Sequence, residues 1–243
     1  MKRVGRVLAA IVIVIALGAT AFGVWAHSVM PGDRTAALAA WNDPGLSVTS
    51  TDHSIVLTPT AEATGIGLVF IPGAKVDPYA YLNKLSGIVE SGVTVVITKP
   101  TLNLAFFDTR RLSVFQADAP SVAHWYVGGH SLGGVKACLL AQTPGVQGLV
   151  LFGSYCANDV SDTGLKVVSI SGSRDGLSTP AKITDAAHNL PKDTIFDQIA
   201  GANHAAFGDY GTQPGDGTAT ISSATMRAEL TAELVSFFAG TAR

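Results

Sequence analysis

The segment Gly128-Gly129-His130-Ser131-Leu132-Gly133-Gly134 decides the fold, because it places a serine between a predicted strand and a predicted helix. The strand covers residues 125–128 and the helix covers residues 132–142. A serine hydroxyl becomes a nucleophile only when it is exposed, aimed and deprotonated by a neighbour, and a sharp strand-turn-helix elbow presents it in this way. Glycines two positions before and after the serine keep side chains out of the turn. We therefore predict that Ser131 is a nucleophile, with the positive end of the following helix favouring nearby negative charge.

A serine nucleophile needs a base and an acid that orients the base, and later strands supply both. A predicted strand at 166–170 runs into a turn that contains Asp175, and a strand at 194–199 runs into a turn that contains His204. The chain order Ser, Asp, His is that of the α/β-hydrolase triad, whereas other serine hydrolases use different orders. We predict His204 as the general base and Asp175 as its orienting carboxylate. Asp159 and Asp162, which follow the preceding strand, remain the alternative acids, since Asp175 beside Gly176 also suits a simple turn.

The remaining histidines give no comparable pattern. His130 adjoins the serine, but its side chain should leave the elbow in another direction, so we interpret it as a packing residue. The other four histidines are His27, His53, His124 and His188, and none of them follows a late strand. No pair of histidines has the spacing of a zinc site. We therefore expect no metal and no organic cofactor.

The loop Ile71-Pro72-Gly73-Ala74-Lys75 follows an early predicted strand and is expected to complete an oxyanion hole. We assign the backbone N–H groups of Ala74 and Leu132 as donors, with Lys75 as the alternative if the loop is shifted by one residue. The Lys75 side chain is a candidate substrate contact or a surface charge. Phe207 and Tyr210, just beyond His204, are candidate walls of the substrate site or ordinary packing aromatics.

The rest of the chain alternates between short apolar runs and helical patterns, with Gly and Pro between them. This pattern predicts an α/β fold with a mostly parallel central sheet and helices on both faces. Helices are expected at 78–91, 132–142 and 224–239. Strands are expected at 55–58, 67–71, 93–98, 125–128, 148–152, 166–170 and 194–199.

The N-terminus differs from the rest, because Lys2, Arg3 and Arg6 precede an uncharged apolar stretch at 7–26. Such a stretch is typical of a membrane anchor or an export signal. Ala19-Thr20-Ala21 offers a cleavage site, so a secreted form stays open beside the preferred anchored form. Either form predicts an extracytoplasmic protein. We expect the anchor or signal at 1–26, a tether at 27–52 and the catalytic domain at 53–243.

Composition and charge exclude other classes of protein. The 243 residues are 47% hydrophobic and 14% charged, as in a compact globular domain. The formal net charge is -2, whereas a nucleic-acid-binding domain is expected to be basic. Two cysteines, Cys138 and Cys156, would meet an oxidising compartment. The sequence leaves open whether they pair or serve as small buried side chains.

Several segments together resemble the α/β-hydrolases, and within them the branch similar to dienelactone hydrolases that is called α/β-hydrolase family 5. They are the elbow, residues 71–78, residues 98–104 and residues 201–211, and the resemblance covers about 66–239. Ala74 departs from the family's more frequent Pro-Gly-Gly loop.

The resemblance implies hydrolysis of an ester or thioester through an acyl-enzyme. Only a short stretch, 154–165, stands where many relatives insert a cap, so we expect no large cap and a shallow, open site for a small or surface-presented ester. An acyltransferase with the same triad and a binding module without activity are the alternatives.

Overall fold

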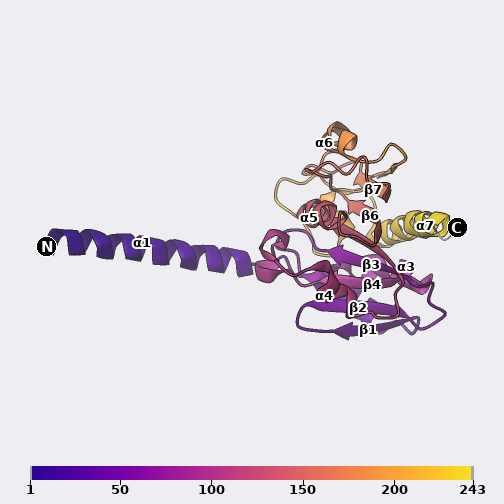
Figure 1. Cartoon of the computed structure of the whole chain (residues 1–243), viewed down its shortest axis with the longest axis horizontal. Coiled ribbons are helices and arrows are strands. Elements are labelled where there is room, and N and C mark those ends of the chain that lie inside the picture. The colour runs from indigo at the N-terminus through magenta and orange to yellow at the C-terminus, as the bar shows by residue number, and fades with distance from the viewer. Residues whose placement is uncertain (1, 242–243) are drawn as a thin grey trace.

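The computed structural model describes residues 2–241 and consists of one central sheet with helices on both faces (Figure 1). The strand order is β1-β2-β4-β3-β5-β6-β7-β8. The pairs β1–β2 and β2–β4 are antiparallel, and every other pair is parallel. The strands are β1 (Leu46–Ser50), β2 (Ser54–Pro59), β3 (Ile66–Ile71), β4 (Thr94–Thr98), β5 (His124–His130), β6 (Val146–Phe152), β7 (Lys166–Gly172) and β8 (Ile195–Ile199).

The helices form two layers, because the central strands are apolar on both faces and need cover on each side. One face packs against α2, α3 and α7, and the other packs against α4 and α5. The helices are α1 (Lys2–His27), α2 (Arg34–Trp41), α3 (Leu82–Glu90), α4 (Leu112–Gln116), α5 (Leu132–Leu140), α6 (Pro180–Asp185) and α7 (Ser223–Thr241). Short 3-10 turns are η1 (Pro78–Tyr81), η2 (Thr101–Asn103), η3 (Ala105–Phe107), η4 (Ala187–Asn189) and η5 (His204–Phe207). The mostly parallel sheet, flanked on both faces, confirms the predicted fold class.

The region predicted as a tether, 27–52, is more ordered than expected. It contains α2 and the edge strand β1, which pairs with β2 along its whole length. Leu46 and Val48 face the core while the residues between them point outward. Pro44 and Gly45 suggested a loop, and an edge strand with one polar side gave too weak an apolar signal to be recognised.

The apolar N-terminal stretch forms α1, a single helix that projects away from the rest of the chain (Figure 1). Residues 3–25 of this helix are long and apolar enough to cross a membrane, with a mean hydropathy of 2.7, and none of that segment is buried by the remainder of the protein. A helix of this length and composition could serve either as a membrane anchor or as an export signal.

Cys138 and Cys156 form a disulfide, which decides between the two possibilities left open by the sequence. The bond joins α5 to the loop after β6, with the two Cα atoms 5.5 Å apart. It therefore fastens the helix that begins directly after Ser131 to a neighbouring strand-end loop.

A buried ion pair connects α3 with the segment that follows η5. Lys84 Nζ lies 2.7 Å from Asp209 Oδ1, and the two side chains are only 1% and 7% exposed. The ammonium also donates to the backbone oxygen and the hydroxyl of Ser223 at the start of α7. Burial lowers the pKa of Lys84, while the negative charge of Asp209 opposes that change. The pair thus ties together three separate parts of the chain.

Replacing Lys84 with methionine is expected to destabilise the protein by about 3–5 kcal/mol, because the buried Asp209 carboxylate would lose its countercharge. Thermal unfolding should show a melting temperature lowered by roughly 10 °C. Lys166→Met is the matched control, since its 3.5 Å pair with Asp193 is 58% and 67% exposed and should contribute under about 1 kcal/mol. Equal effects of the two substitutions would contradict the prediction.

Candidate active site

Ser131 occupies a strained turn between β5 and α5. Its backbone has φ 53° and ψ -125°, in a region that residues other than glycine avoid, and its N–H donates to the Phe152 carbonyl at 3.0 Å. A Cβ on Gly129 would lie 2.5 Å from the Gly133 carbonyl carbon, and a Cβ on Gly133 would collide with the Ile71 carbonyl oxygen. The predicted steric reason, a clash within the elbow, is therefore confirmed for Gly129, whereas Gly133 is needed because the end of β3 approaches it.

Backbone strain is concentrated around this elbow. Among the described residues, the non-glycine positions with positive φ are Lys75, Leu102, Asn103 and Ser131. Lys75 N–H donates to the Asn103 carbonyl at 2.8 Å, so the loop after β3 and the turn η2 form one unit. Strained conformations of this kind persist where the surrounding structure enforces them, and they cluster at functional sites.

Asp175 and His204 form a buried pair at the carboxyl ends of β7 and β8. His204 Nδ1 lies 2.7 Å from Asp175 Oδ2, and both side chains are fully buried. The other carboxylate oxygen accepts the N–H groups of Leu177 and Ser178 at 2.8 and 2.7 Å, which fixes its orientation. Since a carboxylate can only accept, the hydrogen bond assigns the proton to His204 Nδ1 and leaves Nε2 as an acceptor.

Both the Ser131 turn and the Asp175–His204 pair lie next to the end of β6. A Cβ on Gly153, whose φ is +46°, would lie 3.0 Å from Asp175 Oδ2 and 3.3 Å from His204 Nδ1. Ser131 is bonded through its N–H to Phe152, the residue before Gly153. Neither the Ser131 hydroxyl nor His204 Nε2 has a hydrogen-bond partner among the residues that the structure describes. Catalytic hydrogen bonds are often formed fully only when substrate is present.

The structure adds two residues that the sequence did not reveal. Gly153 has no side chain and so leaves the space that Asp175 and His204 occupy. Asp216 accepts N–H groups from Gly176, beside Asp175, and from His204, at 3.1 and 3.0 Å through one oxygen, and from Ala205 at 2.9 Å through the other. Asp216 therefore holds the two loops at a fixed separation. Its position between Gly215 and Gly217 resembled a plain turn, so only the folded chain shows this role.

The loop after β3 leaves one N–H group free. The N–H groups on either side of Ala74 are occupied, because Gly73 donates to Tyr81 Oη at 3.0 Å and Lys75 donates to Asn103. The alternative assignment of Lys75 as an oxyanion donor is therefore wrong. Ala74 N–H donates to no group in the described part of the chain, and Leu132, at the first position of α5, has no intrahelical acceptor.

Other predicted contact residues lie elsewhere than expected. Lys75 Nζ donates to Ser28 Oγ at 2.9 Å and so faces the end of α1. Phe207 is fully buried and stacks on Phe152, and Tyr210 is buried with its hydroxyl donating to Gln213. Both aromatics are packing residues and not an exposed wall, because the turn after His204 points them under the sheet edge. The alternative acids, Asp159 and Asp162, are exposed, and His204 pairs with Asp175 instead.

His130 packs against the His204 ring in the interior. It is fully buried, its Nδ1 lies 2.9 Å from Tyr81 Oη, and its ring centre is 4.4 Å from that of His204. Burial is the main cause, and the nearby His204 imidazole a second cause, that lowers the pKa of His130 well below its usual value. The side chain therefore stays neutral in the folded protein at pH values where an unfolded chain would protonate it.

This difference predicts acid destabilisation. As the pH falls below about 6.5, His130 binds a proton in the unfolded state but not in the folded state. The free energy of unfolding therefore drops by up to about 1.4 kcal/mol per pH unit. His130→Gln should flatten the dependence of unfolding free energy on pH between about 6.5 and 5. His188→Gln, at an exposed histidine, should leave the slope unchanged. An identical slope in all three proteins would show that His130 is not the group responsible.

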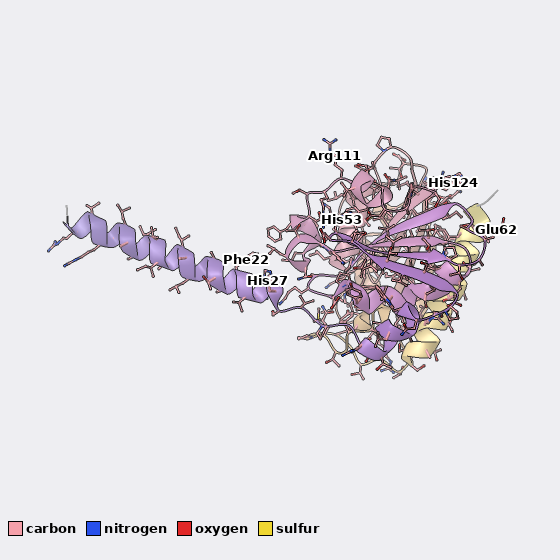
Figure 2. All side chains as sticks on the ribbon, turned by 90° about the horizontal axis from the view of Figure 1, so that it is seen from below. Phe22, His27, His53, Glu62, Arg111 and His124 are labelled. Atoms are coloured by element: carbon pink, nitrogen blue, oxygen red, sulfur yellow. A yellow bond between two sulfur atoms is a disulfide. The ribbon has the colours of Figure 1, made fainter. Side chains whose placement is uncertain are left out.

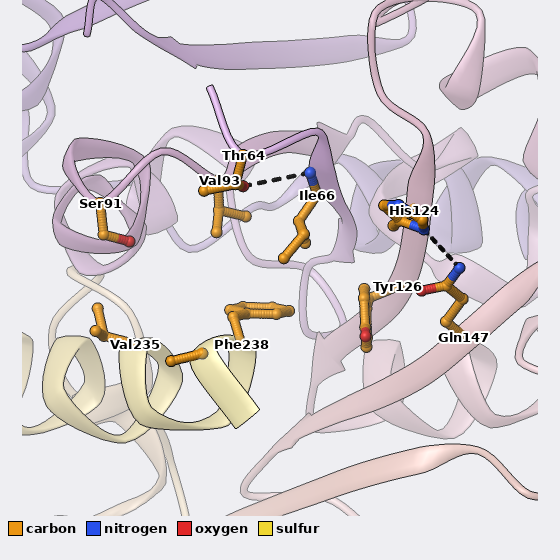
Figure 3. Close-up of a pocket in the computed structure, with 10 residues that line it drawn as sticks. Thr64, Ile66, Ser91, Val93, His124, Tyr126, Gln147, Val235 and Phe238 are labelled. Carbon is orange, nitrogen blue, oxygen red and sulfur yellow. Dashed lines mark hydrogen bonds between the residues drawn. The ribbon is translucent and has the colours of Figure 1, made fainter. Parts of the chain in front are cut away.

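The cavity shown in Figure 3 lies away from these residues. It has a volume of about 580 Å³ and lies at the amino ends of β3 and β5, where Ile66 and His124 begin the strands. His124 Nδ1 and Gln147 Nε2 are 2.8 Å apart at its edge. Ser131 stands at the opposite end of β5, so the candidate site is not this cavity. Within the described residues, no group of three or more His, Cys, Asp or Glu side chains is arranged to hold a metal ion.

Comparison with known proteins places these features in context. The family model described as the alpha/beta hydrolase family matches residues 67–228. No curated protein matches the chain in sequence.

Solved structures show the same fold at low sequence identity. A predicted CIB-like hydrolase from Thermoplasma acidophilum has a TM-score of 0.58 at 13% identity, covering 80% of this chain and 99% of its own. A dienelactone hydrolase from Anabaena variabilis has a TM-score of 0.56 at 15% sequence identity, and the match covers 81% of this chain and 98% of that protein. A Xanthomonas campestris protein described as an a/b serine hydrolase without lid has a TM-score of 0.54 at 14% sequence identity, and the match covers 80% of this chain and 96% of that protein.

Proposed function

The chain belongs to the α/β-hydrolase family, and from this premise we propose that it is a serine hydrolase that cleaves an ester-like bond through an acyl-enzyme. The single observation that carries this proposal is the buried Asp175–His204 pair with its unpartnered Nε2, which follows the carboxyl ends of β7 and β8, as the strained Ser131 elbow follows the carboxyl end of β5. A pairing of this kind costs stability, because a buried imidazole nitrogen without a partner is unfavourable. A role in proton transfer explains why the arrangement is kept.

In the proposed reaction, His204 Nε2 accepts the Ser131 proton while Ser131 Oγ attacks the substrate carbonyl carbon. The negative charge that develops on the carbonyl oxygen is held by the N–H groups of Leu132 and Ala74. The C–O bond to the leaving alcohol then breaks, and His204 returns its proton to that alcohol. Water, deprotonated by His204, releases the acid and restores the Ser131 hydroxyl.

The size of the site limits the substrates. β6 ends at Phe152 and β7 begins at Lys166, so the connection between them holds no cap large enough to enclose a ligand. A carbonyl therefore reaches Ser131 from an open rim. This geometry suits a small ester, or an ester that protrudes from a larger surface, better than one that must be enclosed.

A fluorophosphonate probe tests the proposal, because it reacts only with a serine that is activated as a nucleophile. We expect one equivalent of probe on the peptide that contains Ser131, identified by mass spectrometry, and no labelling of the Ser131→Ala variant. Ser113→Ala, at an exposed serine of α4, should label normally. A folded wild-type protein that resists the probe would favour the alternative of a binding module without activity.

A further inference from the structure

The end of α1 is joined to the loop that contains Ala74. Met30 N–H donates to the Lys75 carbonyl at 2.7 Å, and Asp77 N–H donates to the Met30 carbonyl at 3.0 Å. The Lys75 ammonium donates to Ser28 Oγ and lies 4.3 Å from the centre of the Trp25 ring. The residues that follow α1 are therefore fixed to the rim of the candidate site and do not form a free tether.

A second loop of the rim also reaches α1. The Phe22 ring lies 5.8 Å from the Phe107 ring of η3 in an edge-to-face arrangement. Phe107 and its neighbour Phe106 are large apolar side chains that are 50% and 46% exposed. The same loop carries Asn103, whose carbonyl holds Lys75. The loop after β3 and the segment 101–107, which the Lys75–Asn103 hydrogen bond joins, thus both reach the last turns of the apolar helix.

The composition of α1 places this rim near a lipid surface. Its apolar segment ends at Trp25, and tryptophan is enriched where a membrane span meets water. Met30 is the fifth residue after Trp25, so the rim lies at most about 18 Å from that level even if the chain were fully extended. Figure 2 shows Phe22 and His27 at the domain end of α1, with Glu62 and His124 on the far side of the domain. The amino ends of the strands therefore face away from the helix.

We propose that α1 is retained as an anchor and that it holds the catalytic rim against the bilayer, so that the substrate is an acyl ester carried by a membrane lipid. This inference rests on the proposed function. Phe106 and Phe107 would enter the interfacial layer, where burying apolar area is favourable at about 25 cal/mol per Å². The Lys75 ammonium would lie at the level of lipid phosphates.

The lipid ester suits the chemistry of the open rim. Acyl esters of glycerolipids lie between the headgroups and the hydrocarbon of the bilayer. A shallow site in contact with that layer would therefore reach the ester carbonyl without enclosing the acyl chain. Ser131 Oγ would bond to the acyl carbon, the ester C–O bond would break, and the lipid alcohol would leave with the proton from His204. Water would then release a carboxylic acid into the same membrane.

The placement of the rim can be measured without activity. The full chain is reconstituted in phosphatidylcholine vesicles with a nitroxide at either Phe106→Cys or Ile195→Cys, leaving the native disulfide intact. These positions are 46% and 48% exposed, but Ile195 starts β8 and so lies at the amino ends of the parallel strands. We expect the nitroxide at 106 to be several-fold more accessible to oxygen relative to a water-soluble nickel chelate than the one at 195. Equal, water-like ratios, or cleavage of α1 from the mature protein, would overturn the proposal.

A second experiment separates this proposal from the proposed function. Twelve Gly and Ser residues are inserted between His27 and Ser28, which lets the domain move away by up to about 40 Å. Turnover of the soluble ester p-nitrophenyl butyrate should change less than twofold, whereas turnover of a fluorogenic oleoyl ester embedded in the vesicles should fall at least tenfold. Unchanged turnover of both esters would reject the membrane-facing rim while leaving the hydrolase intact. No turnover of either ester by the wild type would reject the hydrolase itself.

Discussion

Ser131→Ala is expected to lower kcat/KM for a soluble acyl ester by about 10⁵–10⁶-fold, because the acyl-enzyme can no longer form. The residual rate would come from the oxyanion donors alone, which still stabilise attack by water. Kinetics with p-nitrophenyl butyrate, measured over a range of enzyme concentrations, would detect such a loss.

The fold should survive this substitution, since the Ser131 hydroxyl makes no hydrogen bond to any described residue. A melting temperature within about 2 °C of the wild type would therefore show that the loss is chemical. Ser113→Ala provides the matched control, with unchanged kinetics. A Ser131→Ala protein that retains more than a tenth of the activity would place the nucleophile elsewhere.

Asp175→Asn is expected to lower kcat by about 10⁴-fold, with a smaller change in KM. The amide can present an N–H donor to His204 Nδ1, which favours the tautomer with the proton on Nε2. That tautomer cannot accept the Ser131 proton. The size of the effect therefore tests the pairing at 2.7 Å more directly than removal of the carboxylate would.

Asp162→Asn is the control for this experiment, because Asp162 is one of the two alternative acids that the sequence offers and is exposed. Its kinetics should match those of the wild type. If Asp162→Asn were the damaging change and Asp175→Asn were harmless, the acid of the site would have been assigned to the wrong strand end.

The sheet and the elbow could be predicted because their signals are local. Apolar runs at regular intervals predicted the strands of the parallel core, and the need for glycine at position 129 arises from a contact within the elbow itself, with Gly133. The predicted strand at 194–199 corresponds to β8 (Ile195–Ile199), and the helix at 224–239 corresponds to α7 (Ser223–Thr241). Chain order sufficed to propose His204 and Asp175, since successive parallel strands end at one edge.

Features that depend on distant contacts could not be read from the sequence. Asp216 acts on His204 and Gly176 through backbone N–H groups, which leave no pattern of residue types. Phe207 and Tyr210 follow the histidine closely, but the direction of the intervening turn decides whether they face substrate or core. The edge strand β1 was missed because its outer side is polar and its neighbours, Pro44 and Gly45, indicate a loop.

The cross-link between Cys138 and Cys156 also matters for how the protein is produced. Their sequence separation is 18, and closing a loop of about that length stabilises a fold by roughly 3 kcal/mol by restricting the unfolded chain. A bacterial cytosol that keeps thiols reduced would yield a protein with lower thermal stability, because α5 would no longer be linked to the loop after β6. Recombinant enzyme should therefore be directed to the periplasm or refolded with glutathione, and dithiothreitol should lower its thermal midpoint.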